Sequence, residues 1–219
     1  MGKKIGVVLS GCGVYDGAEI HESVVTLLAI DRHGAEAVMC APDIDQLHVV
    51  NHLTGEVEEG ATRNVLVESA RIARGAIRDV VDVSADELDA LILPGGFGAA
   101  KNLCDFAVNG PDCEVDPGVA ALVRAVHGQG KPVASVCIAP ALIAKVLGDE
   151  GPELTIGTDA DTAGALAKMG AAHIECPVTE FDVDQERKLV SSPAYMLAES
   201  ISEAAEGIEK TVKALVDMA

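Results

Sequence analysis

Short, continuously apolar runs alternate along this chain with longer segments of helical character. The runs at 4–9, 35–41, 88–93 and 132–136 are rich in Val, Ile, Leu and Ala and lack the polar alternation of a strand with one face in water. Strands of this kind are buried on both faces, as in a parallel sheet with a layer of helices on each side. Because the connections are short, the pattern predicts an α/β chain with a doubly wound, mostly parallel sheet.

The segments between these runs are expected to be helices, and Gly34 follows the first of them as a left-handed stop. Residues 45–60 predict a short strand and a turn, and residues 104–116 an irregular segment. Residues 178–183 and 188–192 are expected to pair as a hairpin. The expected helices span residues 20–33, 64–74, 117–128, 138–147, 161–169 and 195–217, the last as one helix or two. We therefore predict one flavodoxin-like domain over residues 1–219, with helices on both faces of the sheet and a small β-hairpin.

The charge balance argues against several classes of partner. The 219 residues include 16 Lys and Arg against 35 Asp and Glu, a formal net charge of −19. Nucleic-acid backbones and anionic membrane surfaces would be repelled by this excess. No apolar run approaches the ~20 residues that span a bilayer, and the sequence passes from its start directly into a strand pattern, unlike a signal peptide. We expect a cytoplasmic protein with no nucleic-acid or membrane partner.

The sequence contains six cysteines, and their spacing does not indicate a metal site. They form no C-x-x-C pair and have no H-x-x-x-H partner, so no zinc site is expected. A disulfide framework is also not expected in a large, apolar domain of this type. A cysteine in such a chain is by default a small buried side chain. A functional cysteine has to be identified by its position.

One cysteine lies where a buried strand passes directly into a helix, in the segment K-P-V-A-S-V-C-I-A-P-A-L-I-A-K, residues 131–145. Ligands of open parallel sheets bind beyond the carboxyl ends of the strands, where Cys137 is expected to lie. The start of a helix favours an anion, so we predict a thiolate with a lowered pKa. The N–H of Ile138 would then lie close enough to stabilise an oxyanion. The alternative is a small thiol buried in the core.

Two further segments are expected at the same edge of the sheet. Pro94-Gly95-Gly96 follows the strand at 88–93, and successive glycine N–H groups can bind an anion, although the same residues can simply turn the chain. Glu22 lies near the start of the first helix, where it can share a proton with Cys137 and move protons at neutral pH. A glutamate at a helix start can also serve only to complement the helix dipole.

Several motifs, taken together and in this order, resemble the ElbB family, the glyoxalase branch of the ThiJ/PfpI, class I glutamine amidotransferase-like superfamily, often named for isoprenoid biosynthesis. The motifs are Gly11-Cys-Gly-Val-Tyr-Asp-Gly-Ala-Glu-Ile-His-Glu22, Val50-Asn-His-Leu-Thr-Gly-Glu56, Leu93-Pro-Gly-Gly-Phe-Gly-Ala-Ala-Lys-Asn102, Cys137-Ile-Ala-Pro140, Thr155-Ile-Gly-Thr-Asp159 and Ser192-Pro-Ala-Tyr-Met196. The resemblance implies that Cys137 is the nucleophile, Glu22 its acidic partner, and Gly96 and Ile138 the backbone donors. Further pocket candidates are Gly95, Tyr15, Asp16, His52, Thr158 and Asp159.

The resemblance implies a glyoxalase that uses no glutathione, metal or other cofactor and converts glyoxal or methylglyoxal to glycolate or lactate. It also implies a homodimer. The chain has Ser135-Val-Cys-Ile-Ala139 in place of the G-x-C-x-G of class I amidotransferases, and Ile138 in place of the histidine of PfpI-type peptidases. Two alternatives stay open: a non-catalytic or redox-sensing stress-response protein, and a glutaminase-like amidotransferase subunit.

Overall fold

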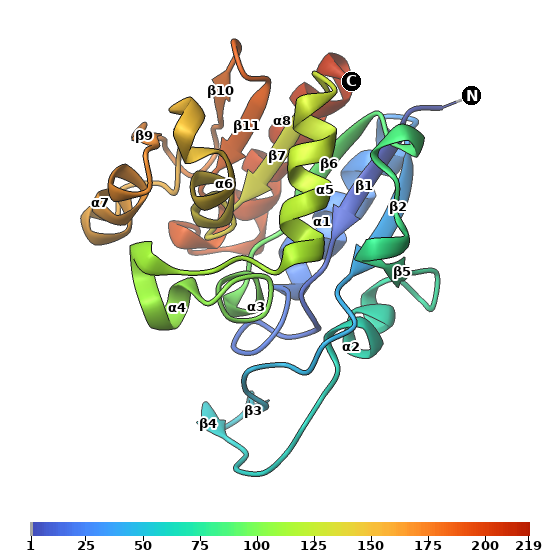
Figure 1. Ribbon diagram of the computed structural model, residues 1–219, viewed down its shortest axis with the longest axis vertical. Coiled ribbons are helices and arrows are strands. Elements are labelled where there is room, and N and C mark those ends of the chain that lie inside the picture. Colours follow the sequence, from blue (N-terminus) through green and yellow to red (C-terminus); the bar gives the residue numbers. More distant parts are fainter. Residues whose placement is uncertain (1) are drawn as a thin grey trace.

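The computed structural model describes residues 2–219, and a seven-stranded sheet lies at its centre (Figure 1). The strands are β1 Lys4–Val8, β2 Glu36–Ala41, β5 Arg78–Asp79, β6 Ala90–Leu93, β7 Val133–Val136, β10 Asp182–Asp184 and β11 Leu189–Ser192. Their order across the sheet is β10-β11-β7-β6-β1-β2-β5. Every pairing is parallel except that of β10 with β11. The flavodoxin-like, mostly parallel sheet and the small hairpin are confirmed.

Helices cover both faces of the sheet, as predicted. Their bounds are α1 Ile20–Arg32, α2 Val65–Ile72, α3 Phe97–Lys101, α4 Phe106–Asn109, α5 Pro117–Gly128, α6 Pro140–Leu147, α7 Ala160–Lys168 and α8 Ile201–Met218. Helices α5 and α6 lie in front of the sheet in Figure 1, and α1 and α8 lie behind it. The helices of each layer pack on a core of their own.

The uninterrupted apolar character of the strands follows from these two cores. Along β6, Leu91 and Leu93 belong to the core under α5 and α6, whereas Ala90 and Ile92 belong to the core under α1 and α8. Successive strand residues point to opposite faces, so a strand between two helix layers needs apolar side chains at every position.

The strand order creates a crevice at the carboxyl ends of the central strands. Strand β1 lies between β2 and β6, and the chain leaves β1 through α1 to reach β2 and arrives at β6 only later. At such a switch point, the connections from neighbouring strands run to opposite faces, which leaves a space above the sheet edge. The segments after β1, β6, β7 and β11 all reach this edge.

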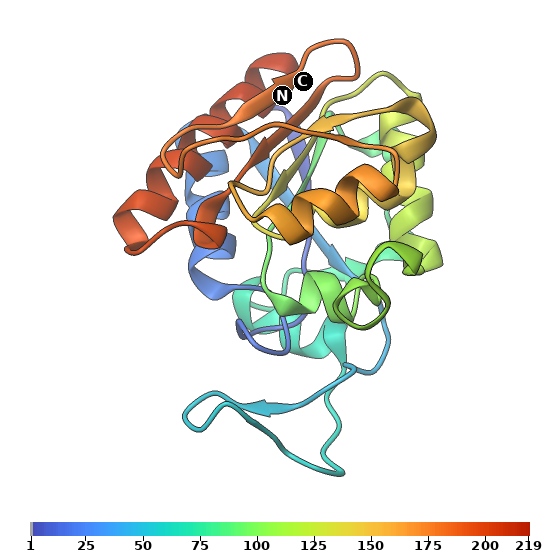
Figure 2. The ribbon, with the colours of Figure 1, turned by 90° about the vertical axis from the view of Figure 1, so that its left-hand side faces the viewer.

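Residues 45–64, here called the arm, extend away from the sheet. Strands β3 Val50–Asn51 and β4 Glu56–Val57 pair within the arm, which protrudes below the body of the protein in Figure 2. Leu53 lies in the turn between them and is 94% exposed. A second small sheet pairs β8 Glu153–Leu154 with β9 Ala172–His173.

Some boundaries differ from the prediction. The helix expected over 138–147 begins at Pro140, because Cys137 has a positive φ of 62° and Ala139 is the N-cap. Residues 104–116, expected to be irregular, contain α4 and a 3₁₀ turn at Gly110–Asp112. The last helical segment is a 3₁₀ turn at Ala194–Met196 followed by the single helix α8.

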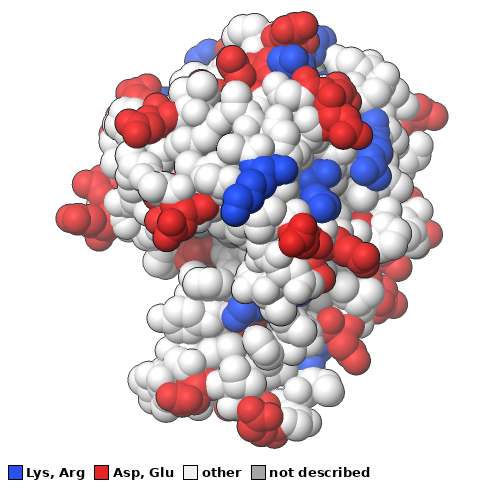
Figure 3. Space-filling model, turned by 60° about the vertical axis from the view of Figure 1, so that its left-hand side comes forward, with Lys and Arg blue, Asp and Glu red and all other residues white. Residues whose placement is uncertain are grey.

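Acidic side chains are spread over the face of the protein seen in Figure 3. Figure 3 shows Asp and Glu distributed around one face, with a smaller group of Lys and Arg near its middle. Within residues 2–219, each helix is too short or too polar to cross a bilayer. The distribution is that of a solvated acidic surface.

Candidate active site

Cys137 occupies a sharp turn between β7 and α6. Its φ of 62° is in the left-handed region, which non-glycine residues adopt rarely and which is typical of strained functional positions. Its backbone N–H donates to the carbonyl of Ser192 at 2.9 Å, so the turn is fixed against the end of β11. The side chain is only 7% exposed and faces a cavity at the carboxyl edge of the sheet.

Glu22 lies beside Cys137 and is fully buried. Its Oε1 accepts the N–H of Tyr195 at 3.1 Å and its Oε2 accepts the N–H of Gly95 at 3.0 Å. Ala194, just before Tyr195, has a positive φ of 43°. The carboxyl group and the thiol of Cys137 lie close enough for each to shift the pKa of the other. The structure therefore brings together the two residues that the sequence nominated as nucleophile and acid.

Gly95 permits this close approach. A Cβ atom at this position would lie 2.4 Å from the Cβ of Cys137, 3.0 Å from its Sγ and 2.7 Å from Oε2 of Glu22. Gly96, with a φ of 95°, is equally constrained, because a Cβ there would lie 2.3 Å from the backbone N of Glu19. Only residues without a side chain fit between the loop after β6 and the start of α1.

Four backbone N–H groups point at the Cys137–Glu22 pair. Those of Gly96 and Ile138 lie near the sulfur of Cys137 and act to lower the pKa of its thiol, and those of Gly95 and Tyr195 donate to Glu22. Such donors favour a negative charge on the pair, whether it resides on sulfur or on oxygen.

Burial governs the ionisation of both groups. It raises the pKa of Glu22 from 4.5 to about 7, helped by the nearby charge of Glu19, while the N–H donors oppose the shift. Burial and the Glu22 carboxylate also raise the pKa of the Cys137 thiol well above its ordinary value. The predicted lowering of this pKa is wrong. The backbone donors of Gly96 and Ile138 act in the predicted direction but are outweighed by burial and the Glu22 charge.

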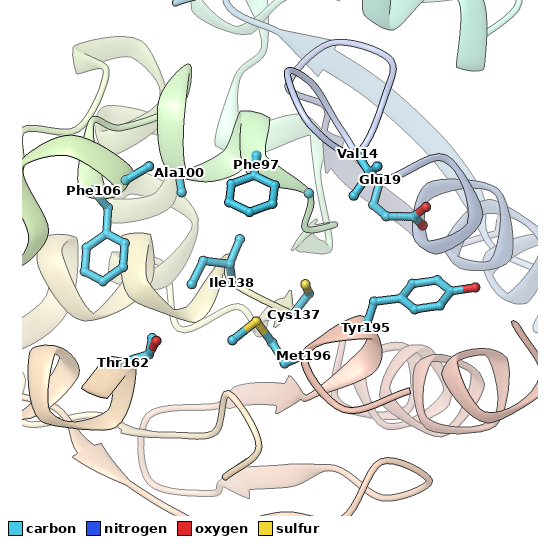
Figure 4. Close-up of a pocket in the computed structure, with 12 residues that line it drawn as sticks. Val14, Glu19, Phe97, Ala100, Phe106, Cys137, Ile138, Thr162, Tyr195 and Met196 are labelled. Carbon is cyan, nitrogen blue, oxygen red and sulfur yellow. The ribbon is translucent and has the colours of Figure 1, made fainter. Parts of the chain in front are cut away.

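A cavity of about 440 Å³ opens beside Cys137. Figure 4 shows Phe97, Phe106 and Ile138 on one side of the thiol, and Glu19 and Tyr195 on the other. Within the described chain, Glu19 is the only charged residue in the lining, which contains neither Lys nor Arg. The apolar part of the wall is formed by Val14, Phe97, Ala100, Phe106, Ile138 and Met196.

Tyr15, Asp16 and His52 were predicted as pocket candidates, and none of them lines the cavity. They instead join the loop after β1 to the arm. Asp16 accepts the N–H of Val50 at 2.8 Å, and His52 Nε2 accepts the N–H of Tyr15 at 3.2 Å. Tyr15 and Asp16 were expected near Cys137 because the loop at 11–17 follows β1. In the structure, this loop bonds to residues 50 and 52 of the arm instead.

Thr158 and Asp159 also lie outside the cavity lining. Asp159 caps α7, where its side chain accepts the N–H of Thr162 at 2.8 Å. Thr162, one turn further, is the residue that reaches the cavity. Gly95 packs against Cys137 and donates its N–H to Glu22, and it is not part of the lining either.

Sequence reasoning missed most of the cavity wall. Glu19 caps α1, and its Oε2 accepts the N–H of Glu22 at 2.6 Å. Tyr195 and Met196 stand in the quoted Ser192–Met196 motif but received no role, and Phe106 lies in the segment expected to be irregular. The motif at 192–196 was the only signal that could have identified two of them.

The described lining contains no histidine. His21 is turned outward and its Nδ1 lies 2.8 Å from the hydroxyl of Tyr195. Among residues 2–219, no group of three or more His, Cys, Asp or Glu side chains could bind a metal ion. The side chains around Cys137 therefore form a thiol–carboxyl pair and not a Cys-His triad.

Curated relatives match almost the whole chain. A human protein named glutamine amidotransferase-like class 1 domain-containing protein 3, mitochondrial, is 46% identical over 98% of this chain and 83% of its own length. A zebrafish protein named ES1 protein, mitochondrial, is 33% identical over 88% of this chain and 76% of its own length. The expected cytoplasmic location is contradicted, because these relatives and a rat ES1 protein homolog are all named mitochondrial.

Solved structures share the fold. An isoprenoid biosynthesis protein with an amidotransferase-like domain from Ehrlichia chaffeensis superposes with a TM-score of 0.91 at 35% identity, over 99% of this chain and all of that chain. Glyoxalase III from Candida albicans superposes with a TM-score of 0.62 at 14% identity, over 97% of each chain, a likeness of fold alone. The DJ-1/PfpI family pattern matches residues 12–194. From the sequence match and these relatives, the chain belongs to the DJ-1/PfpI family.

Proposed function

We propose that the protein is a glutathione-independent glyoxalase that converts a 2-oxoaldehyde into a 2-hydroxy acid. The observation that carries the proposal is the buried contact between Cys137 and Glu22, with four backbone N–H groups directed at the pair. A nucleophile, a group that moves protons and donors for an oxyanion are the parts that this reaction requires.

The first step joins the thiol to the aldehyde. The Sγ of Cys137 forms a bond with the aldehyde carbon, while the Glu22 carboxylate takes the thiol proton. The electron pair of the C=O bond moves to the oxygen, where the N–H groups of Gly96 and Ile138 stabilise the negative charge. Glu22 then passes the proton to this oxygen, which gives a hemithioacetal and restores the carboxylate.

The second step is an internal oxidation and reduction. Glu22 removes the hydrogen of the former aldehyde carbon as a proton, which gives an enediol, and returns a proton to the neighbouring carbon. The first carbon becomes a thioester and the second an alcohol, so no external electron acceptor is needed. Water then breaks the C–S bond, which releases glycolate or lactate and restores the thiol.

A glutaminase-like role has less support, because the described lining offers no histidine to activate the thiol. A redox sensor is also less well supported, because a buried thiol with a raised pKa forms little of the thiolate that peroxides oxidise. The proposed assembly is a homodimer, an expectation that rests on the family resemblance.

The decisive experiment compares the wild type with Cys137→Ser on glyoxal, methylglyoxal and glutamine, with the products identified by chromatography. We expect the wild type to form glycolate and lactate and the variant to fall to the uncatalysed rate. Cys12→Ser is the matched control, since Cys12 is outside the cavity lining, and it should keep full turnover. Glutamine hydrolysis, or dicarbonyl turnover unchanged in Cys137→Ser, would reject the proposal.

A further inference from the structure

The cavity is much larger than the small dicarbonyls named above. Its volume is about 440 Å³, whereas glyoxal occupies roughly 100 Å³, the space of three to four water molecules at about 30 Å³ each. Binding sites in proteins bury most of their ligand's surface. Glyoxal or methylglyoxal in this cavity would leave most of the wall without a partner.

The apolar and the polar residues of the cavity wall lie on opposite sides of Cys137. On one side of Cys137 lie Phe97, Phe106 and Ile138, and on the other lie the carboxyl group of Glu19 and the ring of Tyr195 (Figure 4). A substrate whose carbonyl carbon is held at Sγ therefore directs one substituent towards two aromatic rings and an aliphatic side chain. Apolar burial and ring contacts would stabilise an apolar substituent there.

The charges of the lining argue against an anionic substituent on the substrate. Over the described part of the chain, the lining offers no Lys or Arg to pair with a carboxylate or phosphate, and it carries the acid Glu19. An anionic substituent on the apolar side would be desolvated without a partner in the lining, and Glu19 across the thiol has the same sign. Lys101, whose Nζ lies 5.0 Å from the centroid of the Phe97 ring, is outside the lining and donates to the carbonyl of Tyr15. The substituent is thus neutral as well as apolar.

We infer that the substrate is a 2-oxoaldehyde with a bulky apolar substituent, of the size of a phenyl or branched alkyl group, which packs between Phe97, Phe106 and Ile138. This inference rests on the proposed function for its reacting group, and on the shape and lining of the cavity for the rest. Helix α4 contributes to this substrate site because its first residue, Phe106, forms part of the cavity wall.

The kinetic test measures kcat/KM for glyoxal, methylglyoxal and phenylglyoxal. We expect phenylglyoxal to be used at least about tenfold better than methylglyoxal, within the ~10–200-fold range that even one added methylene produces in an apolar pocket. Phe106→Ala should lower kcat/KM for phenylglyoxal roughly tenfold and leave that for glyoxal within about twofold. Val108→Ala is the matched control, because Val108 lies on the same helix, is 65% exposed and does not line the cavity.

A second readout does not require turnover. Acetophenone, which has no aldehyde, should slow alkylation of Cys137 by iodoacetamide in the wild type, measured by peptide mass spectrometry, and acetone should not. Phe106→Ala should lose this protection and Val108→Ala should keep it.

The outcomes separate the two hypotheses. Turnover of glyoxal and methylglyoxal without preference for phenylglyoxal, and without protection by acetophenone, overturns the inference and leaves the proposed function intact. Absence of turnover on all three dicarbonyls rejects the proposed function, and the inferred substrate class with it. Protection by acetophenone would in that case still support an apolar binding site beside Cys137.

Discussion

The proton held by Glu22 couples the stability of the protein to pH. Its pKa is about 7 in the folded protein and 4.5 in the unfolded chain, so the folded state binds more protons between these values. The free energy of unfolding therefore falls as pH rises from 4.5 to 7, by on the order of 3 kcal/mol. Below pH 4.5 this contribution is fully present, and above pH 7 it is lost.

Glu22→Gln removes this titration, and we expect its unfolding free energy to lack that part of the pH dependence. Urea unfolding of both proteins at pH 4.5, 6 and 8 measures the difference. The amide leaves one N–H of Gly95 or Tyr195 without an acceptor, a constant penalty of about 1–3 kcal/mol that does not change with pH. Parallel pH curves for the two proteins would contradict the assignment.

Gly95→Ala should disable the site with a smaller effect on the fold. The new Cβ would lie 2.4 Å from the Cβ of Cys137, so the thiol and Glu22 must separate. We expect kcat/KM on glyoxal to fall by ~10² or more, because a displacement of about 1 Å at a reacting group has this cost. Gly164→Ala in α7 is the control, since a Cβ there meets open space, and helix propensity stabilises it by up to ~1 kcal/mol. Equal activity of both variants would show that the close approach is dispensable.

The identities of the paired residues could be inferred from the sequence, but their ionisation could not. Cys137 follows a buried strand and Glu22 begins a helix, and both positions are local signals. The pKa of the thiol depends mainly on total burial and on a carboxylate from another element. The expectation that a helix start lowers the pKa of a thiol gave the opposite direction, because it takes no account of burial or of Glu22.

At the scale of elements, the arm is held to the body by few polar contacts. The buried carboxylate of Asp16 accepts the N–H of Val50, and His52 accepts the N–H of Tyr15. The strands β3 and β4 are two residues each and do not join the main sheet. A further hydrogen bond runs from the N–H of Leu47 to Oδ1 of Asn102 at 3.0 Å, so the arm depends on a small number of such contacts for its position.

Asp16→Ala should loosen the arm. Loss of a hydrogen bond to a charged group costs about 1.5–3 kcal/mol, so we expect the amides of residues 50–57 to exchange roughly tenfold to a hundredfold faster in hydrogen–deuterium exchange. The amides of β1 and β7 should be unaffected. Glu59→Ala, at an exposed position of the arm, is the control and should match the wild type. Unchanged exchange in Asp16→Ala would mean that the arm is held by other contacts.

Element boundaries were predicted to within a residue at several helices that begin with a capping side chain. Asn64, Asp116 and Asp159 each accept a backbone N–H at the start of their helices. Ser200 caps α8 in the same way, but the last helical segment was expected to begin at residue 195. The start of α6 was misplaced because its N-cap is Ala139, which has no side-chain acceptor. The short helix α4 has no capping bond and only four residues, so its sequence carries no periodic pattern.

For the whole molecule, the sheet type was predictable and the cavity was not. Buried runs alternating with helices specify a parallel sheet, whichever strands are neighbours. The cavity wall combines residues from α3, α4, α7 and the turn after β11 with Cys137. Their convergence depends on how the two helix layers meet the sheet edge, which is a property of the assembled fold. The place of Phe106 in the cavity wall can therefore be recognised only from the three-dimensional arrangement of the helices and strands.

Glu22 receives its two N–H bonds from residues 73 and 173 positions further along the chain. The second comes from Tyr195, close to the final helix, so a ribosome must have released nearly the whole chain before the acid can be held in place. A nascent or truncated chain would present Cys137 as an exposed thiol of ordinary pKa, without the carboxyl group and the backbone donors that surround it in the folded protein. Such a thiol could add to an aldehyde but would have no partner to move the proton, so complete turnover requires the completed fold.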